Sequence, residues 1–208
     1  MEEFNIENFR QKVKNSKMEF LSLKKSDEIF SFFNNYNYIL TEKAKERLNK
    51  LYTYIKKGIP VILEGDTGSS KTFSAELICK YIYKEENKNN ITLKKEEEEM
   101  YIKYNLSADV KISDLMKKFI GNKNCLSNII DGPFYKAIKK GLPLILDEIN
   151  LASEEVLQCI EDTLDSGEIN IEISGIGLIK QKITSGFCLI ATQNLNTEKY
   201  MNKRQNLS

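Results

Sequence analysis

Short runs of apolar residues alternate along this chain with longer stretches in which apolar residues recur at helical spacing. The runs are bounded by glycine or polar residues, as in buried parallel strands, and they predict strands at residues 59–63, 142–146 and 187–192. A further strand is predicted at residues 101–106. The longer stretches predict helices at residues 43–57, 71–84, 112–120, 132–140 and 153–164. Strands that alternate with helices indicate an α/β fold with an open, mostly parallel sheet, which binds ligands at the carboxyl ends of its strands.

Polar residues mark where several of these helices should begin. Thr41 and Ser153 precede helical stretches, and their side-chain oxygens can cap the first N–H groups. For the helix at 112–120, the expected cap is either Ser113 or Asp109. The capping residues therefore support the helix positions that the apolar spacing indicates.

Three further segments precede or interrupt this alternation. Residues 168–173 and 178–183 alternate apolar and polar positions around two glycines, which predicts a β-hairpin before the last strand. Residues 85–99 are rich in Lys, Asn and Glu and predict a solvated insertion loop, with an acidic interaction patch as the alternative. Residues 1–37 are charged with scattered aromatics, and we expect an N-terminal extension, either a linker or a helical lead-in whose aromatic side chains dock. The predicted domain proper is residues 38–208.

Composition limits the classes of protein that this chain can be. Its 208 residues suffice for one α/β domain, and a second full domain is not expected. Lys and Arg number 31 against 30 Asp and Glu, and a net charge of +1 does not favour nucleic acid as a direct partner. Residues 1–14 are polar, and no apolar run approaches the roughly 20 residues that cross a bilayer. We therefore expect an intracellular, soluble protein of the cytoplasm or nucleus without a membrane partner.

The chain contains no histidine and four widely spaced cysteines. Without histidine, acid and base chemistry near neutral pH falls to carboxylates. The cysteines lack the local spacing of a zinc site, and we expect reduced, mostly buried thiols at Cys79, Cys125, Cys159 and Cys188.

The strand at 59–63 is followed directly by a loop of small and polar residues that ends in Lys-Thr at the start of a helix. A phosphate-binding loop needs small residues so that N–H groups can turn inward, a lysine for the β- and γ-phosphates, and a hydroxyl for magnesium. The helix adds its N-terminal dipole, which favours an anion. We therefore expect ATP phosphates to bind at Gly65, Asp66, Thr67, Gly68, Ser69, Ser70, Lys71 and Thr72. A Gly/Ser-rich turn before Lys-Thr is the alternative.

Ser70 departs from the usual phosphate-loop pattern, which has glycine before the lysine. If the backbone must take positive φ at this position, serine costs roughly 1 kcal/mol or more. We then expect nucleotide affinity that is weakened without being abolished.

Two carboxylates, Asp147 and Glu148, directly follow the strand at 142–146. At the carboxyl end of a buried strand they must be solvated or bound to a cation. We expect Asp147 to hold magnesium together with the Thr72 hydroxyl, and Glu148 to polarise the water that attacks the γ-phosphate. An exposed acidic pair without such a role is the alternative.

Asn194 follows the last predicted strand and should reach the same sheet edge as the two carboxylates. Its amide can orient the attacking water or contact the γ-phosphate. We therefore include Asn194 with Lys71 and Glu148 among the expected catalytic residues, and an ordinary turn residue is the alternative.

Four segments resemble the dynein-related, midasin-like branch of the AAA+ ATPases, over residues 39–194. They read LEGDTGSSKT, YNLSADVKISDLM, DGPFYKAIKKGLPLILDEINLASEEVLQCIEDTLDSGEI and FCLIATQN. The resemblance implies the P-loop NTPase fold, a three-layer α/β/α arrangement with a β-hairpin insertion before the sensor strand, and it implies ATP and Mg²⁺ as cofactors. In that family, Asp147 and Glu148 would belong to the Walker B segment and Asn194 would be sensor 1.

Such ATPases work as modules of a ring, in which an arginine of one module completes its neighbour's active site and hydrolysis remodels protein complexes. By analogy, the resemblance implies neighbouring AAA+ modules as partners, with a protein substrate that the residues do not specify. The chain stops at Ser208, before the expected arginine-finger segment and helical lid, and Arg204 lies in the lead-in to that segment. Because such an arginine is worth roughly 10³ to 10⁵ in rate, we expect this chain alone to bind nucleotide better than it hydrolyses it.

The sequence supports three other functions less well. A catalytically silent nucleotide-binding module, in which ATP serves assembly, gains support from Ser70 and from the missing lid and finger. A GTPase is disfavoured because residues 122–125, the nearest approach to an Asn-Lys-x-Asp signature, lack the aspartate. A nucleic-acid helicase is disfavoured because the charge is balanced and no basic or aromatic stripe accompanies the loop.

Overall fold

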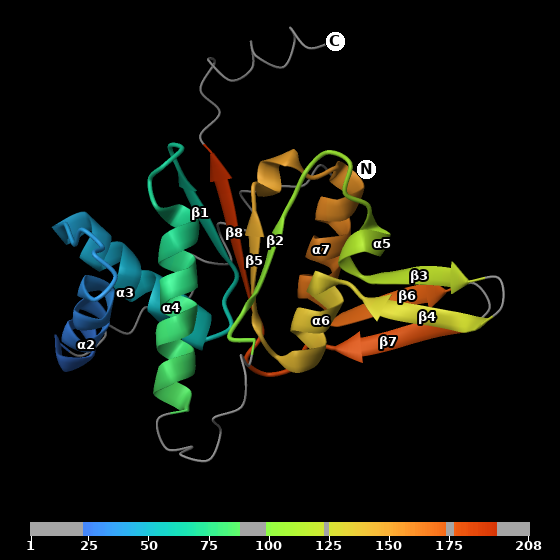
Figure 1. Ribbon diagram of the computed structural model, residues 1–208, viewed down its shortest axis with the longest axis horizontal. Helices are drawn as coiled ribbons and strands as arrows, with labels where there is room; N and C mark the ends of the chain where they lie inside the picture. The colour runs from blue at the N-terminus through green and yellow to red at the C-terminus, as the bar shows by residue number, and fades with distance from the viewer. Residues whose placement is uncertain (1–22, 88–98, 123–124, 174–176, 195–208) are drawn as a thin grey trace, which may run out of the picture.

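A four-stranded parallel sheet forms the centre of the fold, which we describe from a computed structural model. The structure describes residues 23–87, 99–122, 125–173 and 177–194. The sheet runs in the order β1-β8-β5-β2, with every neighbouring pair parallel (Figure 1). Its strands are β1 (Val61–Gly65), β8 (Cys188–Asn194), β5 (Pro143–Asp147) and β2 (Ile102–Asn105). All four predicted strands are confirmed, with ends that differ by one or two residues.

The register of the sheet aligns the carboxyl ends of its strands. Gly65 at the end of β1 pairs with Asn194 at the end of β8, and Asn105 of β2 pairs with Asp147 of β5. The strands continue past the apolar runs, so Asp147 and Asn194 are the last residues of strands instead of loop residues. The ladder therefore fixes the backbone of both polar residues at one edge of the sheet.

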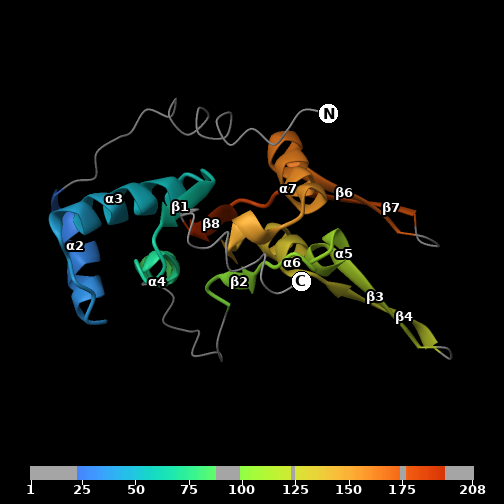
Figure 2. The ribbon, with the colours of Figure 1, turned by 90° about the horizontal axis from the view of Figure 1, so that it is seen from above.

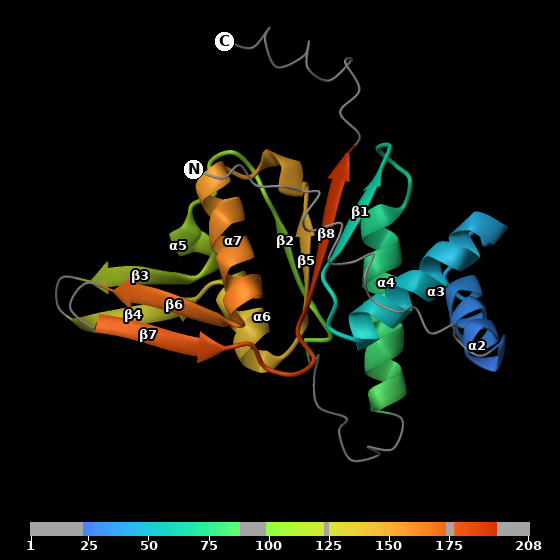
Figure 3. The ribbon, with the colours of Figure 1, turned by 180° about the vertical axis from the view of Figure 1, so that it is seen from behind.

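Helices cover both faces of the sheet, which confirms the three-layer α/β/α arrangement (Figure 2 and Figure 3). The first apolar core lies between the sheet and three helices, α2 (Leu23–Asn34), α3 (Glu42–Lys56) and α4 (Lys71–Glu86). The second core lies on the opposite face with α5 (Ile112–Leu115), α6 (Pro133–Lys140) and α7 (Glu154–Ser166). Within β5, Ile145 contacts the first core, whereas Leu144 and Leu146 contact the second. Burial on both faces explains why this strand is an unbroken apolar run in the sequence.

Two of the predicted helix caps are confirmed. Thr41 Oγ1 accepts a hydrogen bond from the N–H of Ala44 at 3.2 Å, and α3 begins at the next residue. Ser153 Oγ accepts from the N–H of Val156 at 3.4 Å at the start of α7. Both side chains satisfy N–H groups that have no acceptor within the helix.

The helix predicted at residues 112–120 is wrong beyond its first turn. α5 ends at Leu115, and the chain continues as β3 (Lys117–Asn122), which pairs with β4 (Cys125–Asp131) in an antiparallel hairpin. The strand at 117–122 depends on a partner later in the chain, and pairing of that kind overrides local helical spacing.

The predicted caps of α5 are also wrong. Lys111 is the N-cap residue, in place of Ser113 or Asp109. The N–H of Lys111 donates to Asp114 Oδ2 at 3.1 Å, so the side chain of the first turn supports the backbone before it.

The hairpin predicted before the last strand is confirmed. β6 (Glu168–Ile173) pairs antiparallel with β7 (Gly177–Lys182), with Glu168 opposite Lys182. In Figure 1 this hairpin and the β3–β4 hairpin extend toward the same side, away from α2 and α3. Gly175 lies outside the described residues.

α2 packs its aromatic and aliphatic side chains against α3 and α4. Ile29 and Phe33 are fully buried in the first core, and the Phe32 ring meets the Tyr81 ring edge-on with centroids 5.4 Å apart. The docking of aromatic residues that we expected for a helical lead-in is therefore present in this helix. The described residues do not include Phe4, Phe9 or Phe20, and the domain boundary after residue 37 stays a prediction.

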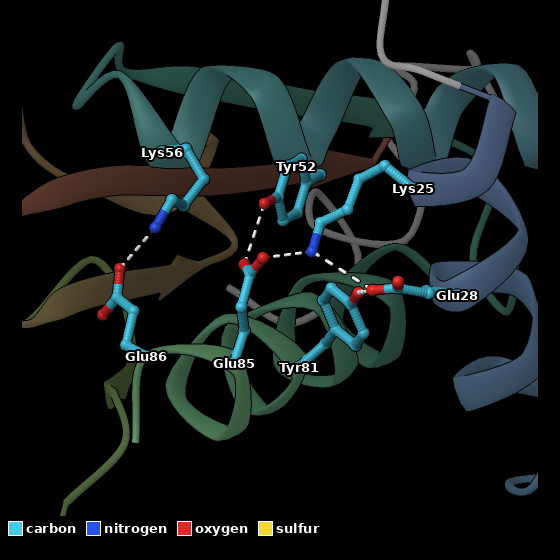
Figure 4. Close-up of polar contacts among 7 residues, drawn as sticks. All are labelled: Lys25, Glu28, Tyr52, Lys56, Tyr81, Glu85 and Glu86. Atoms are coloured by element: carbon cyan, nitrogen blue, oxygen red, sulfur yellow. Dashed lines mark hydrogen bonds and ion pairs between the residues drawn. The ribbon is translucent and has the colours of Figure 1, made fainter. Parts of the chain in front are cut away.

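A polar cluster, composed of Lys25, Glu28, Tyr52, Tyr81 and Glu85, lies where α2 meets α3 and α4 (Figure 4). Lys25 Nζ donates to the Glu85 carboxylate, and the Tyr52 hydroxyl donates to its other oxygen at 2.8 Å. Burial opposes ionisation of Glu85, but the hydrogen bonds from Lys25 and Tyr52 outweigh it and lower the pKa of this carboxyl below its ordinary value. Charge as well as packing therefore joins α2 to α4.

The three cysteine side chains that the structure describes, Cys79, Cys159 and Cys188, are free thiols. Cys79 and Cys188 are buried as expected, and burial raises the pKa of the Cys188 thiol to about 12. Cys125 lies outside the described side chains. Within the described parts of the chain, no helix has the length and apolar character needed to cross a membrane.

Candidate functional site

The connection between β1 and α4 brings small residues and a helix N-terminus to the carboxyl edge of the sheet (Figure 1). The N–H of Ser69 donates to the Asp66 carbonyl at 3.2 Å, which closes a turn around Gly68. Gly68 has φ of 81°, a conformation that glycine adopts without steric cost. The first N–H groups of α4 lack acceptors within the helix, and with the helix dipole they make this end favourable for an anion.

Ser70 has the backbone conformation for which serine is costly. Its φ is 60° and its ψ is 27°, in the left-handed region, and it is the N-cap residue of α4. The Ser70 carbonyl accepts from the Ser74 N–H at 2.9 Å and from Ser74 Oγ at 2.6 Å. A hydrogen bond of 2.8 Å connects Ser74 Oγ to the Tyr38 hydroxyl. These contacts hold the strained residue, and its effect on nucleotide affinity stays a prediction.

The Lys71 side chain is buried and reaches from α4 to the end of β8. Its Nζ lies 2.9 Å from the Gly65 carbonyl and 2.8 Å from the Asp66 carbonyl. The same ammonium lies 3.1 Å from Asn194 Oδ1, although the two residues are far apart in the chain. Lys71 therefore brings a positive charge to the point where the loop faces the sheet edge.

Two hydroxyl groups meet on one carboxylate oxygen at the end of β5. Thr72 Oγ1 donates to Asp147 Oδ1 at 2.9 Å, and Thr192 Oγ1 donates to the same oxygen. Thr72 comes from the first turn of α4 and Thr192 from β8, so three segments meet at this carboxylate. The structure thus brings together Thr72 and Asp147, the two residues predicted to hold magnesium.

Glu148 leaves β5 in a left-handed conformation and turns back toward β8. Its φ is 60° and its ψ is 47°, and its N–H donates to Thr192 Oγ1 at 3.3 Å. Its Oε1 accepts from Asn194 Nδ2 at 2.5 Å. Asn194 therefore bridges Lys71 and Glu148, with its carbonyl oxygen toward the ammonium and its amide nitrogen toward the carboxylate.

These side chains surround a cavity of about 280 Å³ that opens at the carboxyl edge of the sheet. Of the predicted loop residues, Gly65 and Asp66 are absent from its lining, and their carbonyl groups contact Lys71 instead. The lining consists of Thr67, Gly68, Ser69, Ser70, Lys71, Thr72, Phe73, Asp147, Glu148, Thr192 and Asn194. A carboxylate and a hydroxyl are hard oxygen ligands of the kind that Mg²⁺ binds, so Asp147 and Thr72 fit this ion.

A larger cavity of about 670 Å³ lies between α2 and α4. Its charged lining mixes both signs, with Lys24 and Lys84 beside Asp27, Glu28 and Glu85. The smaller cavity is the candidate site because its charged groups suit a specific ligand. Lys71 and the N-terminus of α4 favour an anion, and Asp147 and Glu148 favour a cation.

Two residues of the lining, Thr192 and Phe73, were missed in the sequence. The only signal for Thr192 is its hydroxyl at the end of an otherwise apolar run, and for Phe73 its position directly after the loop. Phe73 is 42% exposed and its ring stacks on Tyr38 with centroids 6.1 Å apart. Arg204 and the segment that should lead to an arginine finger lie outside the described residues.

Comparisons with known proteins bear on the fold and the family of this chain. A solved structure from Cytophaga hutchinsonii ATCC 33406, provisionally named an ATPase, shares the fold with a TM-score of 0.54 at 20% identity, over 85% of this chain and 46% of that one. Midasin of Giardia intestinalis is 27% identical over 158 residues, which are 76% of this chain and 3% of that protein. The uncharacterized protein YojN of Bacillus subtilis (strain 168) is 32% identical over 133 residues, 59% of this chain and 39% of YojN.

The chain thus spans well under half the length of these two relatives. The family model of the AAA domain, dynein-related subfamily, matches residues 60–207, which include the loop, both carboxylates and Asn194. This match extends over most of the chain, and the chain therefore belongs to the dynein-related subfamily of AAA domains.

Proposed function

We propose that this chain binds ATP with Mg²⁺ at the cavity between α4 and the sheet edge and hydrolyses it. Membership of the AAA family supports nucleotide binding and hydrolysis in general. The observation that carries the proposal is the meeting of the loop with the acidic strand end, since Thr72 Oγ1 lies 2.9 Å from Asp147 Oδ1. Because of this contact, the phosphates and the metal ion can bind in the same cavity.

The loop residues bind the phosphates. Residues 67–70 line the cavity, and the N-terminus of α4 adds its dipole. The Lys71 ammonium neutralises charge on the β- and γ-phosphates. Because Lys71 is already held by the Gly65 and Asp66 carbonyls, its side chain is preorganised near the position where this charge is needed.

Thr72 and Asp147 hold the metal ion. When bound, Mg²⁺ neutralises phosphate charge and orients the γ-phosphate for displacement. The two residues come from α4 and β5, so binding of the ion would further join these two elements.

Glu148 is the general base and Asn194 orients the water. The chain contains no histidine, and Glu148 is the carboxylate of the cavity that is free of the proposed metal role. Its Oε1 contacts the Asn194 amide, so the two side chains can hold one water between them and the γ-phosphate.

The larger role proposed is that of a ring module that remodels protein complexes. It rests on the similarity to midasin and on the family, whose members use an arginine of a neighbouring module in hydrolysis. The partners are other AAA modules, and the remodelled substrate is a protein.

The Glu148→Gln variant tests the proposal. We expect ATP affinity to stay near that of the wild type, while the rate of hydrolysis falls at least about 100-fold because a general base is lost. Binding is measured by titration of a fluorescent ATP analogue, and hydrolysis by phosphate release with protein in excess over ATP, which detects slow turnover. The control is Glu155→Gln, an exposed carboxylate on α7, which should leave both values unchanged. Equal rates for Glu148→Gln and the wild type would show that Glu148 is not the base.

A catalytically silent module, in which ATP serves assembly, is the second candidate. Ser70 supports it, since a serine in the left-handed conformation stands where the phosphate-loop pattern has glycine. The same titration and phosphate-release assay separate the two candidates. Binding without any phosphate release, even after addition of full-length neighbouring modules, would favour the silent module.

A further inference from the structure

The buried Thr192 hydroxyl contacts both carboxylate residues of the site. Thr192 lies on β8 with 1% of its surface exposed, although threonine carries a polar group that must be satisfied when buried. Its Oγ1 donates to Asp147 Oδ1 and accepts from the Glu148 N–H at 3.3 Å. A hydroxyl has one proton to donate and lone pairs to accept with, so both contacts can exist at once.

This hydroxyl acts at the point where the pairing of β5 with β8 ends. The last aligned residues of these two strands are Leu146 and Ala191. On the opposite side, the backbone of Thr192 is aligned with Leu63 of β1. The Thr192 side chain therefore continues the connection between β5 and β8 by one more residue and reaches the turn that carries Glu148.

The turn at Glu148 needs such a support because its backbone is strained. A non-glycine residue with φ of 60° persists only where its surroundings hold it. The contact from the Glu148 N–H to Thr192 joins this strained residue to the central strand. The same hydroxyl fixes one oxygen of the neighbouring Asp147, so the two carboxylates are oriented relative to each other.

We infer that Thr192 is a positioning residue that sets how Asp147 receives Mg²⁺ and how Glu148 faces the γ-phosphate. This inference rests on the proposed function for its effect on ATP, whereas its effect on the Glu148 backbone is independent of any ligand. Partners that orient metal ligands in this way typically matter about 10- to 100-fold for metal affinity or activity.

Two substitutions separate positioning from packing. Thr192→Val keeps the shape of the side chain and removes the hydroxyl, while Thr192→Ser keeps the hydroxyl and removes a buried methyl group. If Thr192 only fills space, the valine variant should resemble the wild type more closely than the serine variant does. If it positions the two carboxylates, the serine variant should resemble the wild type more closely.

We expect Thr192→Val to raise the Mg²⁺ concentration for half-maximal ATP binding, and to lower the rate of single-turnover hydrolysis, each by about 10- to 100-fold. ATP binding in EDTA should change little, because the loop and Lys71 are untouched. Thr192→Ser should stay within about 3-fold of the wild type in all three measurements, even if its midpoint of thermal unfolding is lower.

Amide hydrogen exchange at Glu148, measured by NMR without nucleotide, provides the readout that needs no ligand. Loss of the Thr192 acceptor should speed exchange of this amide by about 10-fold in Thr192→Val. Thr192→Ser should retain the wild-type rate. Exchange and Mg²⁺ dependence in Thr192→Val that match the wild type would overturn the inference. A wild-type chain that binds no ATP would instead contradict the proposed function, and the exchange rates would still decide the role of Thr192.

Discussion

Two of the three non-glycine residues with positive φ, among those that the structure describes, line the same cavity. Ser70 and Glu148 both have φ of 60°, whereas Asn37 lies outside this lining. Strain of this kind costs of order 1–3 kcal/mol at each position and persists where the surrounding structure determines it. At the residue scale, the site therefore combines a strained loop with a strained strand exit.

Replacement of Ser70 by glycine should relieve the strain in the loop. Glycine adopts positive φ freely, and the gain of about 1 kcal/mol is partly offset by its greater freedom in the unfolded chain. We expect the free energy of unfolding of Ser70→Gly to rise by up to about 1 kcal/mol, with ATP affinity equal to or above that of the wild type.

The matched control for this prediction is Ser70→Ala, which keeps the backbone strain and removes the hydroxyl. Chemical denaturation of both variants should show a gain for glycine and little change for alanine. A gain of equal size in both variants would assign the effect to the hydroxyl, and a loss with glycine would contradict the prediction.

Residue types and their order were sufficient to predict most of the site. Lys71, Thr72, Asp147, Glu148 and Asn194 lie at or beyond the carboxyl ends of strands that share an edge, and parallel strands bring such residues together. Thr192 could not be predicted in this way. Its role depends on contacts with the ends of a neighbouring strand, and a threonine in a strand is otherwise an ordinary residue.

At the scale of the elements, α2 is held on the first core by the polar cluster as well as by apolar packing. The side chains of Lys25 and Glu85 are 18% and 23% exposed, so this ion pair is screened less by water than a surface pair. Glu85 also accepts from the Tyr52 hydroxyl, and this shared carboxylate joins all three helices of the first core.

Removal of the Glu85 charge should therefore weaken the attachment of α2. We expect Glu85→Gln to lower the free energy of unfolding at pH 7 by about 2 kcal/mol, the usual value of hydrogen bonds to a charged group. The control is Glu86→Gln, which removes the neighbouring and more exposed contact to Lys56 and should have a much smaller effect (Figure 4).

The difference in free energy of unfolding between the wild type and Glu85→Gln should depend on pH, because the pKa of Glu85 is lowered in the folded state. A carboxyl with a lower pKa in the folded state stabilises the fold at pH values above its ordinary pKa, and this stabilisation is lost as pH falls through the folded-state pKa. Urea denaturation of the wild type and of Glu85→Gln should show a difference in stability at pH 7 that disappears at strongly acidic pH. A difference that stays constant with pH would show that the charge of Glu85 is not its cause.

The β3–β4 hairpin shows where prediction of elements from local patterns fails. The central strands β5 and β8 are apolar runs because both of their faces are buried, and the sequence identifies them. The hairpin strand at 117–122 is stabilised instead by pairing with residues 125–131, so its conformation depends on a second strand and not on its own spacing of apolar residues.

At the scale of the whole molecule, the candidate site joins the two faces of the sheet. Lys71 and Thr72 belong to α4 on the first core. Asp147 ends β5 and Glu148 follows it, between Leu146 and Ile149 of the second core. A ligand that contacts both groups binds only the folded arrangement, because the unfolded chain does not hold them together. Binding should therefore stabilise the molecule as a unit.

We expect ATP with Mg²⁺ to raise the midpoint of thermal unfolding. At a ligand concentration 100 times the dissociation constant, linkage gives about 2.7 kcal/mol, which corresponds to roughly 5 to 10 °C for a chain of this size. Differential scanning fluorimetry with ATP and with GTP would measure the shift and the base preference together.

The control for this prediction is Lys71→Ala, compared with and without ATP so that any loss of intrinsic stability cancels. Its shift should be much smaller than that of the wild type, because the cation that meets the phosphates is gone. An equal shift in this variant would place the nucleotide elsewhere on the molecule.

The sequence by itself determined the class of fold, the four central strands and the order of residues around the site, because these depend on local patterns and on the rules of parallel sheets. Only the tertiary structure decided the left-handed backbone at Ser70 and Glu148, the β3–β4 hairpin and the contacts of Thr192. The contacts of Thr192 join distant parts of the chain, and the hairpin depends on pairing between two strands. The left-handed residues depend on the packing around them, so none of these features follows from the spacing of residues within one segment.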